Sequence, residues 1–208
     1  MGKLTEEAAP PLQLRGLAVH AGLIDEAGQA AMAEDIRQVV RVVPMRAPVT
    51  PSGRKMSVRM SAAGDLGWVS DAGGYRYSAR HHSGIPWPPI PASVLRVWEL
   101  VSGCRRPPDS CLINLYGEGA RMGMHRDADE ACLDWPVVSV SLGDDALFRI
   151  GNLQRGGRTE SVWLHSGDVV VMGGEARLRY HGIDRIRFGS SKLLCNGGRL
   201  NLTLRVAG

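Results

Sequence analysis

The sequence predicts a mainly β protein of the α+β class, in which a jelly-roll is supported by helices from the N-terminal half. Two observations lead to this prediction. Two segments with helical character precede residue 102, and seven short β-like segments follow residue 110 with glycine-rich turns between them. Strands that come after the helices, rather than alternating with them, favour antiparallel sheets with helices packed on one face.

The two helices are predicted from their hydrophobic spacing and their start signals. Asp25 is a good N-cap for a helix that runs to about Val42. A second helix is expected from Ser93, acting as its cap, to Val101. The apolar stripe of the first helix has helical period and indicates contact with the core. This stripe consists of Met32, Ile36, Val39, Val40 and Val43.

The rest of the chain is predicted to be β-rich. Residues 44–91 are rich in Gly, Pro and Ser, with β-like pieces at Lys55–Met60 and Gly74–Ser78. No internal repeat or second domain is evident, so we expect one domain over 1–208, with the jelly-roll core at 108–206. The strands expected in this core are 111–116, 136–142, 146–151, 160–164, 168–173, 177–182 and 199–206.

Composition and cysteine usage exclude several classes of protein. With 208 residues, 44% of them hydrophobic, the chain can bury a substantial core. No apolar run approaches the roughly 18 residues that a membrane span needs, and no signal peptide is evident. We therefore expect no membrane partner. A monomer is also expected, and the cysteines described next suggest the cytoplasm. The cysteines show no C-x-x-C spacing and are interpreted as reduced packing residues: Cys104, Cys111, Cys132 and Cys195.

The net charge of +4 is concentrated in one segment. Residues 44–90 contain six basic and two acidic residues, whereas the remainder is balanced at 19 of each. This pattern indicates a polyanionic partner that reaches the segment, although a soluble loop that happens to be basic is the alternative. His81 and His82 also lie here and are interpreted as surface residues. The basic residues are Arg46, Arg54, Lys55, Arg59, Arg76 and Arg80.

Three residues form a candidate metal site. His125 and Asp127 are separated by one residue, so in extended backbone their side chains point the same way. His181 ends a later β-like segment. Two histidines and one carboxylate are the ligand set of non-heme Fe(II) oxygenases, which leaves positions open for oxygen and a cosubstrate. Zinc accepts the same ligands, and an accidental surface turn is the alternative for the His-x-Asp pair alone.

The last predicted strand alternates between polar and apolar residues. Leu200, Leu202 and Leu204 occupy one face. A solvated outer face of an antiparallel strand is one interpretation of the polar side. Taken alone the strand favours that interpretation, but two arginines on the polar face would instead suit a bidentate grip on carboxylates. The polar positions are Arg199, Asn201, Thr203 and Arg205.

These motifs, taken in order along the chain, resemble the AlkB family of Fe(II)/2-oxoglutarate dioxygenases, and most closely its bacterial branch. The resemblance covers nearly the whole chain from about Leu14. It is carried by Thr50-Pro-Ser-Gly53, Leu66-Gly-Trp68, Gly74-Tyr-x-Tyr77, Trp87-Pro-x-Ile-Pro91, Asn114-x-Tyr116, His125-x-Asp127, Ser139-Val-Ser-Leu-Gly143, the 165–174 stretch, Tyr180-His-Gly-Ile183 and Arg199-x-Asn-x-Thr-x-Arg205.

The resemblance implies a double-stranded β-helix that uses Fe(II), 2-oxoglutarate and molecular oxygen. It assigns the iron to His125, Asp127 and His181. Arg205 is expected to pair with the distal carboxylate of 2-oxoglutarate, with hydrogen bonds from Asn114 and Tyr116. Arg199 and Asn201 are expected nearer the end that chelates the metal.

The resemblance also implies that 44–90 is a nucleotide-recognition segment that covers the damaged base. Trp68 and Tyr75 are expected to enclose the base, although ordinary packing is the alternative for either residue alone. Asp129 corresponds to an acidic residue near the base edge. Arg54 and Lys55 are expected to contact phosphates, and Met60 is assigned to the substrate side.

The implied activity is oxidative dealkylation of 1-methyladenine and 3-methylcytosine, with formaldehyde released and 2-oxoglutarate converted to succinate and CO2. The implied partner is alkylated DNA, single-stranded by preference, with RNA as a second polymer. Alternatives are the same chemistry on tRNA or a small molecule, or a lesion-binding protein without turnover. Two departures stand out: Met172 replaces a Trp that is common in close relatives, and Arg126, between the ligands, has no assigned role.

Overall fold

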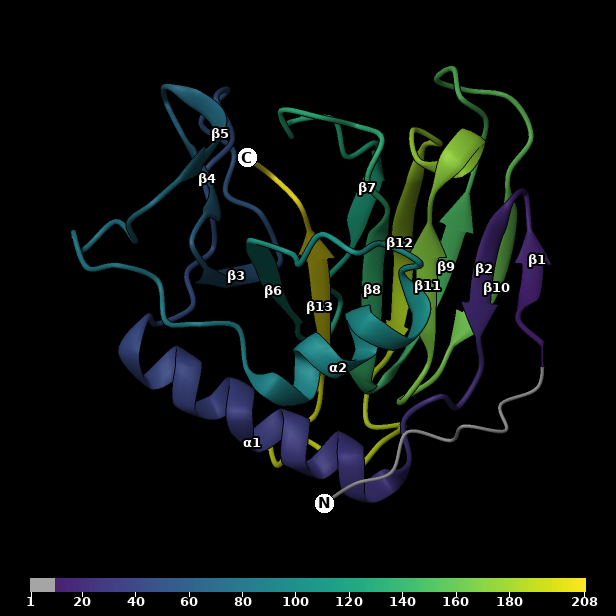
Figure 1. Cartoon of the computed structure of the whole chain (residues 1–208), viewed down its shortest axis with the longest axis horizontal. Coiled ribbons are helices and arrows are strands. Elements are labelled where there is room, and N and C mark those ends of the chain that lie inside the picture. Colours follow the sequence, from purple (N-terminus) through teal and green to yellow (C-terminus); the bar gives the residue numbers. More distant parts are fainter. Residues whose placement is uncertain (1–9) are drawn as a thin grey trace.

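Two β-sheets face each other, and two helices pack on the outer side of the larger sheet (Figure 1). The structure is a computed structural model that describes residues 10–208. The helices are α1 (Glu26–Val42) and α2 (Ala92–Val101), and a 3-10 turn, η1, covers Gly174–Ala176. Neither helix, in the part of the chain described, is long and apolar enough to cross a membrane.

The larger sheet has the order β1-β2-β11-β8-β13-β6-β3, and the smaller has the order β10-β9-β12-β7. All pairings in them are antiparallel, so the predicted jelly-roll with supporting helices is confirmed. The larger sheet contains β1 (Leu12–Leu14), β2 (Leu17–His20), β3 (Arg59–Gly64), β6 (Ser110–Tyr116), β8 (Val137–Gly143), β11 (Val169–Met172) and β13 (Arg199–Arg205). The smaller contains β7 (Met122–His125), β9 (Asp145–Ile150), β10 (Glu160–Leu164) and β12 (His181–Arg187).

Alternation along the central strands separates two cores. Because successive side chains of a strand point to opposite faces, Leu202 and Leu204 of β13 pack toward the helices with Ile36 and Trp98. A second cluster between the sheets includes Phe148 of β9. The polar residues of β13 also point between the sheets, and the functional pocket forms there.

A third, two-stranded sheet shares no hydrogen-bonded ladder with the other two. It is formed by β4 (Gly67–Asp71) and β5 (Gly74–Ser78), which Figure 1 shows at the opposite end of the molecule from α1. The base of this hairpin lies close to Trp87. A Cβ atom on Gly67 would lie 2.3 Å from the Trp87 ring, so only glycine allows this approach.

The first helix begins as predicted, but the cap of the second was wrongly assigned. Asp25 Oδ1 accepts a hydrogen bond from the Gly28 N–H at 2.7 Å, as an N-cap should. The N-cap of α2 is Pro91. Ser93 lies inside the helix, where its hydroxyl donates to Asp35 of α1 and joins the two helices.

Several other expectations are corrected by the structure. The strand expected at 177–182 is wrong for residues 177–180, because hydrogen bonds from Arg177 to Gly174 and from Arg179 to Ala176 close turns after η1; β12 begins only at His181. The β-like piece at 55–60 overlaps β3 only at its last two residues. His81 is buried rather than superficial, with its ring against Trp87. Four strands were not predicted: β1, β2, β4 and β7.

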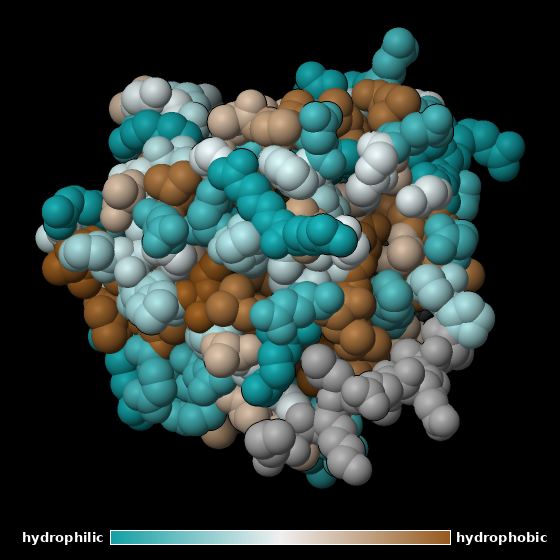
Figure 2. Space-filling model, in the orientation of Figure 1, coloured by the Kyte–Doolittle hydropathy of each residue, from teal (hydrophilic) through white to brown (hydrophobic). Residues whose placement is uncertain are grey.

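The helical face of the molecule shows hydrophilic and hydrophobic residues together (Figure 2). Val42 of α1 and Leu100 of α2 are exposed large hydrophobic residues. Single exposed residues of this kind are normal on a folded protein. The exposed hydrophobic residues of the helical face therefore do not indicate a binding surface.

Candidate active site

The two histidines are brought together by the pairing of β7 with β12. His125 ends β7 and lies directly opposite His181, the first residue of β12. The strands approach closely at the next position, since a Cβ on Gly182 would lie 2.6 Å from the Met122 carbonyl oxygen. Asp127 follows two residues after His125, where regular strand structure has ended.

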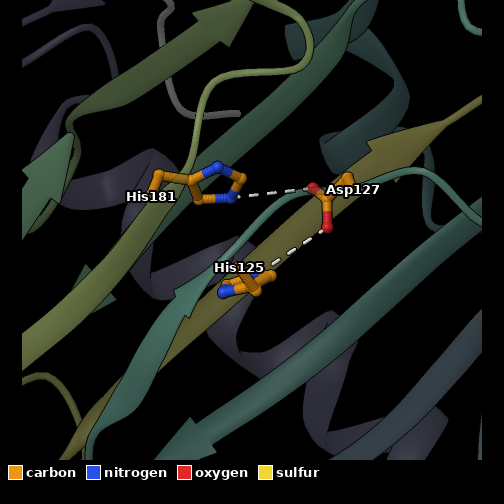
Figure 3. Close-up of side chains that lie close together, drawn as sticks. All are labelled: His125, Asp127 and His181. Carbon is orange, nitrogen blue, oxygen red and sulfur yellow. Dashed lines mark ion pairs between the residues drawn. The ribbon is translucent and has the colours of Figure 1, made fainter. Parts of the chain in front are cut away.

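The side chains of His125, Asp127 and His181 point toward one another (Figure 3). Their candidate ligand atoms all lie within 4.8 Å of one another. His125 Nε2 lies 3.8 Å from Asp127 Oδ1, and His181 Nε2 lies 3.8 Å from Oδ2. These separations are too long for hydrogen bonds and leave room for an ion between the three groups.

Hydrogen bonds on the far side of each imidazole prepare both rings for a metal. His125 Nδ1 donates to the Gly123 carbonyl at 2.9 Å, and His181 Nδ1 donates to the Arg179 carbonyl at 3.0 Å. A proton on Nδ1 leaves Nε2 with a free lone pair. In both rings, Nε2 is the nitrogen that faces Asp127.

The charge states also suit a divalent cation. Burial by itself would raise the pKa of Asp127, but Arg205, His181 and His125 together hold it well below its usual range. Burial lowers the pKa of His181 to about 4, and the neighbouring His125 contributes. Near neutral pH the site therefore offers a carboxylate and a neutral buried imidazole. Two histidines and one carboxylate fit Fe(II) with open positions.

A pocket extends from these ligands between the sheets. Every residue of β13 is buried, so the solvated outer face considered for this strand is wrong. Asn114 and Tyr116 of β6 also line the pocket and are 4% and 3% exposed. The predicted metal and cosubstrate residues thus share one cavity: His125, Asp127, His181, Asn114, Tyr116, Arg199, Asn201 and Arg205.

Arg199 is a buried cation whose donors are only partly used. Its side chain lies over the Tyr116 ring at 5.4 Å, and Nη2 donates to Ser141 Oγ at 2.9 Å. Nε and Nη1 are buried without a hydrogen-bond partner. Burial lowers the pKa of Arg199, because a desolvated guanidinium lacks a full counter-charge there. A carboxylate bound at this point would satisfy both the charge and the donors, which fits 2-oxoglutarate.

Arg205 lies beside the candidate metal ligands, although it was expected to pair with the distal carboxylate of 2-oxoglutarate. Its Nη2 donates to Asp127 Oδ2 at 2.7 Å, so it contacts a candidate metal ligand. The position at the far end belongs to Arg199. Asn201 lines the pocket, but its amide group donates to Ser139 and to the Val140 carbonyl, so it is engaged within the sheet.

The hairpin β4–β5 places two aromatic residues at the pocket. The rings of Trp68 and Tyr75 stack at 5.3 Å, with an angle of 19° between their planes. Trp68 Nε1 donates to Asp129 Oδ2 at 2.8 Å, and Met60 lines the pocket with them. Tyr75 is 48% exposed, so one member of the stacked pair remains accessible.

The other predicted substrate residues and the two departures have distinct positions. Arg54 and Lys55 are exposed on the loop before β3 and do not line the pocket. Met172 is buried in the pocket wall. Arg126 lines the pocket and lies 5.8 Å from the Tyr180 ring centre. It therefore has an aromatic partner that the sequence did not suggest.

Three residues near the site, two of them buried and Tyr77 half-buried, were not assigned from the sequence. They are Tyr77 of β5, Glu130, and Arg177 beside η1, and all three make polar contacts around Asp127 or Arg205. Tyr77 lies within the motif Gly74-Tyr-x-Tyr77, so the sequence could have indicated a role for it. No feature of the sequence indicates a role for Arg177, because an arginine before a strand is ordinarily exposed.

Known proteins resemble this chain over most of its length. A family model described as the 2OG-Fe(II) oxygenase superfamily matches residues 16–205. The alpha-ketoglutarate-dependent dioxygenase AlkB homolog of Caulobacter vibrioides is 49% identical over 201 residues, which are 96% of this chain and 91% of that protein. The alpha-ketoglutarate-dependent dioxygenase AlkB of Escherichia coli K12 is 42% identical over 179 residues, covering 84% and 82%.

Two further matches extend beyond bacterial sequences. A protein of Arabidopsis thaliana named DNA N(6)-methyladenine demethylase ALKBH1D is 41% identical over 108 residues, 47% of this chain and 24% of that protein. The solved structure of OsALKBH1 has a TM-score of 0.77 and 28% identity, and covers 94% of this chain and 99% of that one. Together with the candidate metal triad, these matches show that the chain belongs to the AlkB family of the 2OG-Fe(II) oxygenase superfamily, in its bacterial branch, and is an Fe(II)- and 2-oxoglutarate-dependent dioxygenase that uses O2.

Proposed function

We propose that this dioxygenase removes N-alkyl groups from nucleic-acid bases, with 1-methyladenine and 3-methylcytosine in DNA as its main substrates and RNA as a second polymer. The observation that carries the proposal is the stacked pair of Trp68 and Tyr75 at a pocket that contains the iron ligands. A base inside a duplex cannot reach such a pocket, so it must be turned out of the helix. Aromatic stacking then recovers part of the energy of unstacking.

The names of relatives support a nucleic-acid substrate. The Arabidopsis thaliana protein is named a DNA demethylase, and it matches about half of this chain. The excess of basic residues in 44–90 suits a phosphate backbone, with Arg54 and Lys55 exposed and available for contact. Arg76 is less available, because it forms a pair with Asp71 at 2.7 Å.

Each part of the pocket has a role in this proposal. When bound, Fe(II) with 2-oxoglutarate and O2 supplies the oxidation of the N-alkyl carbon, with succinate and CO2 as co-products. Arg199 holds the distal carboxylate of the cosubstrate, assisted by Asn114 and Tyr116. Burial raises the pKa of Tyr116 to about 12, so its hydroxyl keeps its proton. Arg205 orients Asp127, which holds the iron with the two histidines.

Single strands are the proposed preferred substrates. Both lesions block Watson–Crick pairing, so a lesion is extruded most easily where little pairing or stacking must be broken. Asp129, already hydrogen-bonded to Trp68, lines the pocket, where its carboxylate can accept a hydrogen bond from an amino group at the edge of a base. We propose that the enzyme works as a cytoplasmic monomer, since one chain contains all of the groups named here.

The experiment that tests this proposal is mass spectrometry of oligonucleotides that carry single defined lesions. Each is incubated with the protein, Fe(II), 2-oxoglutarate and O2, and the His181→Ala protein serves as the control. We expect 1-methyladenine and 3-methylcytosine each to lose the mass of one CH2 group, as a methyl is replaced by hydrogen, and to do so faster in single strands than in duplexes. Normal succinate formation without removal of either lesion from DNA or RNA would favour a tRNA-modifying or small-molecule enzyme instead.

A further inference from the structure

We propose that the buried pair Glu130 and Arg177 positions the iron ligand Asp127 and couples it to the hairpin over the pocket. The positioning part concerns the iron site itself. The coupling part rests on the proposed function, in which the β4–β5 hairpin covers the base.

The segment that carries Asp127 needs such a support. Between the end of β7 and the start of β8, residues 126–136 form no helix or strand. A ligand on irregular backbone is not held by a ladder of sheet hydrogen bonds. Other contacts must therefore keep Asp127 opposite the two histidines.

Arg177 provides three of these contacts from one guanidinium group. Its Nη1 donates to the Asp127 carbonyl oxygen at 2.7 Å, and its Nε donates to the Trp135 carbonyl at 2.9 Å. Its Nη2 lies 3.1 Å from Glu130 Oε2. Arg177 is 3% exposed, so these contacts are shielded from water. A planar guanidinium with fixed donors thus fastens the beginning, the middle and the end of the segment.

Glu130 joins Arg177 to the arginine that touches the iron ligand. The side chain of Glu130 is 1% exposed, and its Oε1 lies 3.2 Å from Arg205 Nε. Arg205 in turn donates to Asp127 Oδ2. The side chain and the backbone carbonyl of Asp127 are therefore held by the same buried network. In this network two arginines balance two carboxylates, and removal of either Glu130 or Arg177 leaves an unpaired buried charge.

Two hydrogen bonds connect this segment to the hairpin. The Tyr77 hydroxyl donates to Glu130 Oε1 at 3.1 Å and accepts from Arg205 Nη1 at 3.3 Å. Trp68, on the other strand of the hairpin, donates to Asp129. The hairpin that would hold the base is thus hydrogen-bonded to the same short segment that carries Asp127. Neither Glu130 nor Arg177 belongs to the cluster of candidate ligands, so both are positioning residues.

Metal affinity tests the positioning role without any nucleic acid. Mn(II) binding is measured by titration calorimetry on metal-free Glu130→Gln, Arg177→Met and Arg177→Lys proteins. The control is Glu160→Gln, which removes the carboxylate of the Arg15–Glu160 ion pair at the outer edge of the smaller sheet. We expect the Kd for Mn(II) to rise about 10-fold to 100-fold for Gln and Met, partly restored by Lys. Unchanged Mn(II) affinity in folded variants would overturn the positioning role.

Tyr77→Phe tests the coupling to the hairpin with the smallest change. The test can be made even if the Glu130 or Arg177 variants fail to fold. This variant removes one hydroxyl and retains the ring. We expect more succinate formed per lesion repaired, by about 3-fold or more, since a few-fold change corresponds to one modest hydrogen bond. An unchanged ratio would overturn the coupling. Because the Mn(II) experiment contains no substrate, the positioning role and the proposed function fail separately.

Discussion

The guanidinium of Arg205 donates to the Asp127 carboxylate at 2.7 Å, whereas Arg199 begins the same strand six residues earlier. At the rise of a β-strand, that separation is roughly 20 Å between the two Cα atoms. Arg205 therefore lies beside the candidate metal ligands, and Arg199 lies at the far end of the pocket. Replacing them should produce two different defects.

Arg199→Ala should weaken binding of 2-oxoglutarate by about 2–5 kcal/mol, because a buried carboxylate loses its charged partner. The Michaelis constant for 2-oxoglutarate measures this effect. Arg199→Lys should restore only part of the loss, since an ammonium group cannot reproduce the two-pronged contact. An unchanged constant in Arg199→Ala would contradict the assignment of the distal carboxylate to this residue.

Arg205→Ala should weaken metal binding more than cosubstrate binding. The variant removes the hydrogen bond to Asp127 and part of the charge that keeps this carboxyl ionised. We expect the Kd for Mn(II) to rise about 10-fold or more, as for other residues that orient metal ligands. If only the Michaelis constant for 2-oxoglutarate changed, the originally expected role of Arg205 would be correct after all.

His181→Ala should reduce turnover to background. It removes one of three protein ligands from an ion that must also hold two small molecules. Folding should be retained, because the two hydrophobic clusters do not depend on the ion. Succinate formation is the activity measurement and circular dichroism is the check on folding. Full turnover without added imidazole would remove His181 from the ligand set.

The stability of the metal-free protein should fall between pH 6.5 and pH 4. Burial lowers the pKa of His181 to about 4, so in this range the unfolded chain binds a proton that the folded site refuses. The accumulated loss should reach about 3 kcal/mol near pH 4. Urea unfolding of the metal-free protein at several pH values measures it, and His181→Asn is the matched control. Equal slopes for both proteins would contradict the buried neutral imidazole.

Trp68→Ala should weaken binding of lesion-containing strands by roughly 1–3 kcal/mol and leave binding of undamaged strands nearly unchanged. Neutralising Arg54 or Lys55 should instead weaken binding to all sequences alike and lower its salt dependence. Fluorescence anisotropy at several salt concentrations separates the two effects. A loss in Trp68→Ala that is equal for damaged and undamaged strands would mean that the ring only packs.

The residues that meet in the pocket were predictable where strand alternation or motif spacing carries the information. Polar and apolar positions of β13 alternate without a break. The side chains of His125 and Asp127 point toward the same site, as their spacing of two residues predicts. Six strands of the two large sheets were also predicted to within about one residue at each end, because buried strands leave apolar runs between glycine turns: β6, β8, β9, β10, β11 and β13. The predictions at 55–60 and 177–182 missed most of β3 and β12.

What the sequence could not show depends on contacts between distant segments. Nothing local distinguishes Arg177 from an ordinary surface arginine, since its partners are 42 to 50 residues away along the chain. The short strand β7 has only four residues and a glycine within it, so no alternation was visible. The order of Arg199 and Arg205 relative to the metal likewise follows from the pairing of strands, which spacing alone does not contain.

Because β4 and β5 form a sheet of their own, this hairpin, which is proposed to cover the base, could be replaced by the hairpin of a relative. No strand that carries a proposed iron or cosubstrate residue pairs with β4 or β5, so the hairpin shares no ladder with those strands. Its sequence can vary without shifting the register of β6, β12 or β13, provided that Tyr77 and the close approach at Gly67 are kept. A chimaera that receives the hairpin of a relative should therefore inherit that relative's choice of base while retaining its own oxidation chemistry.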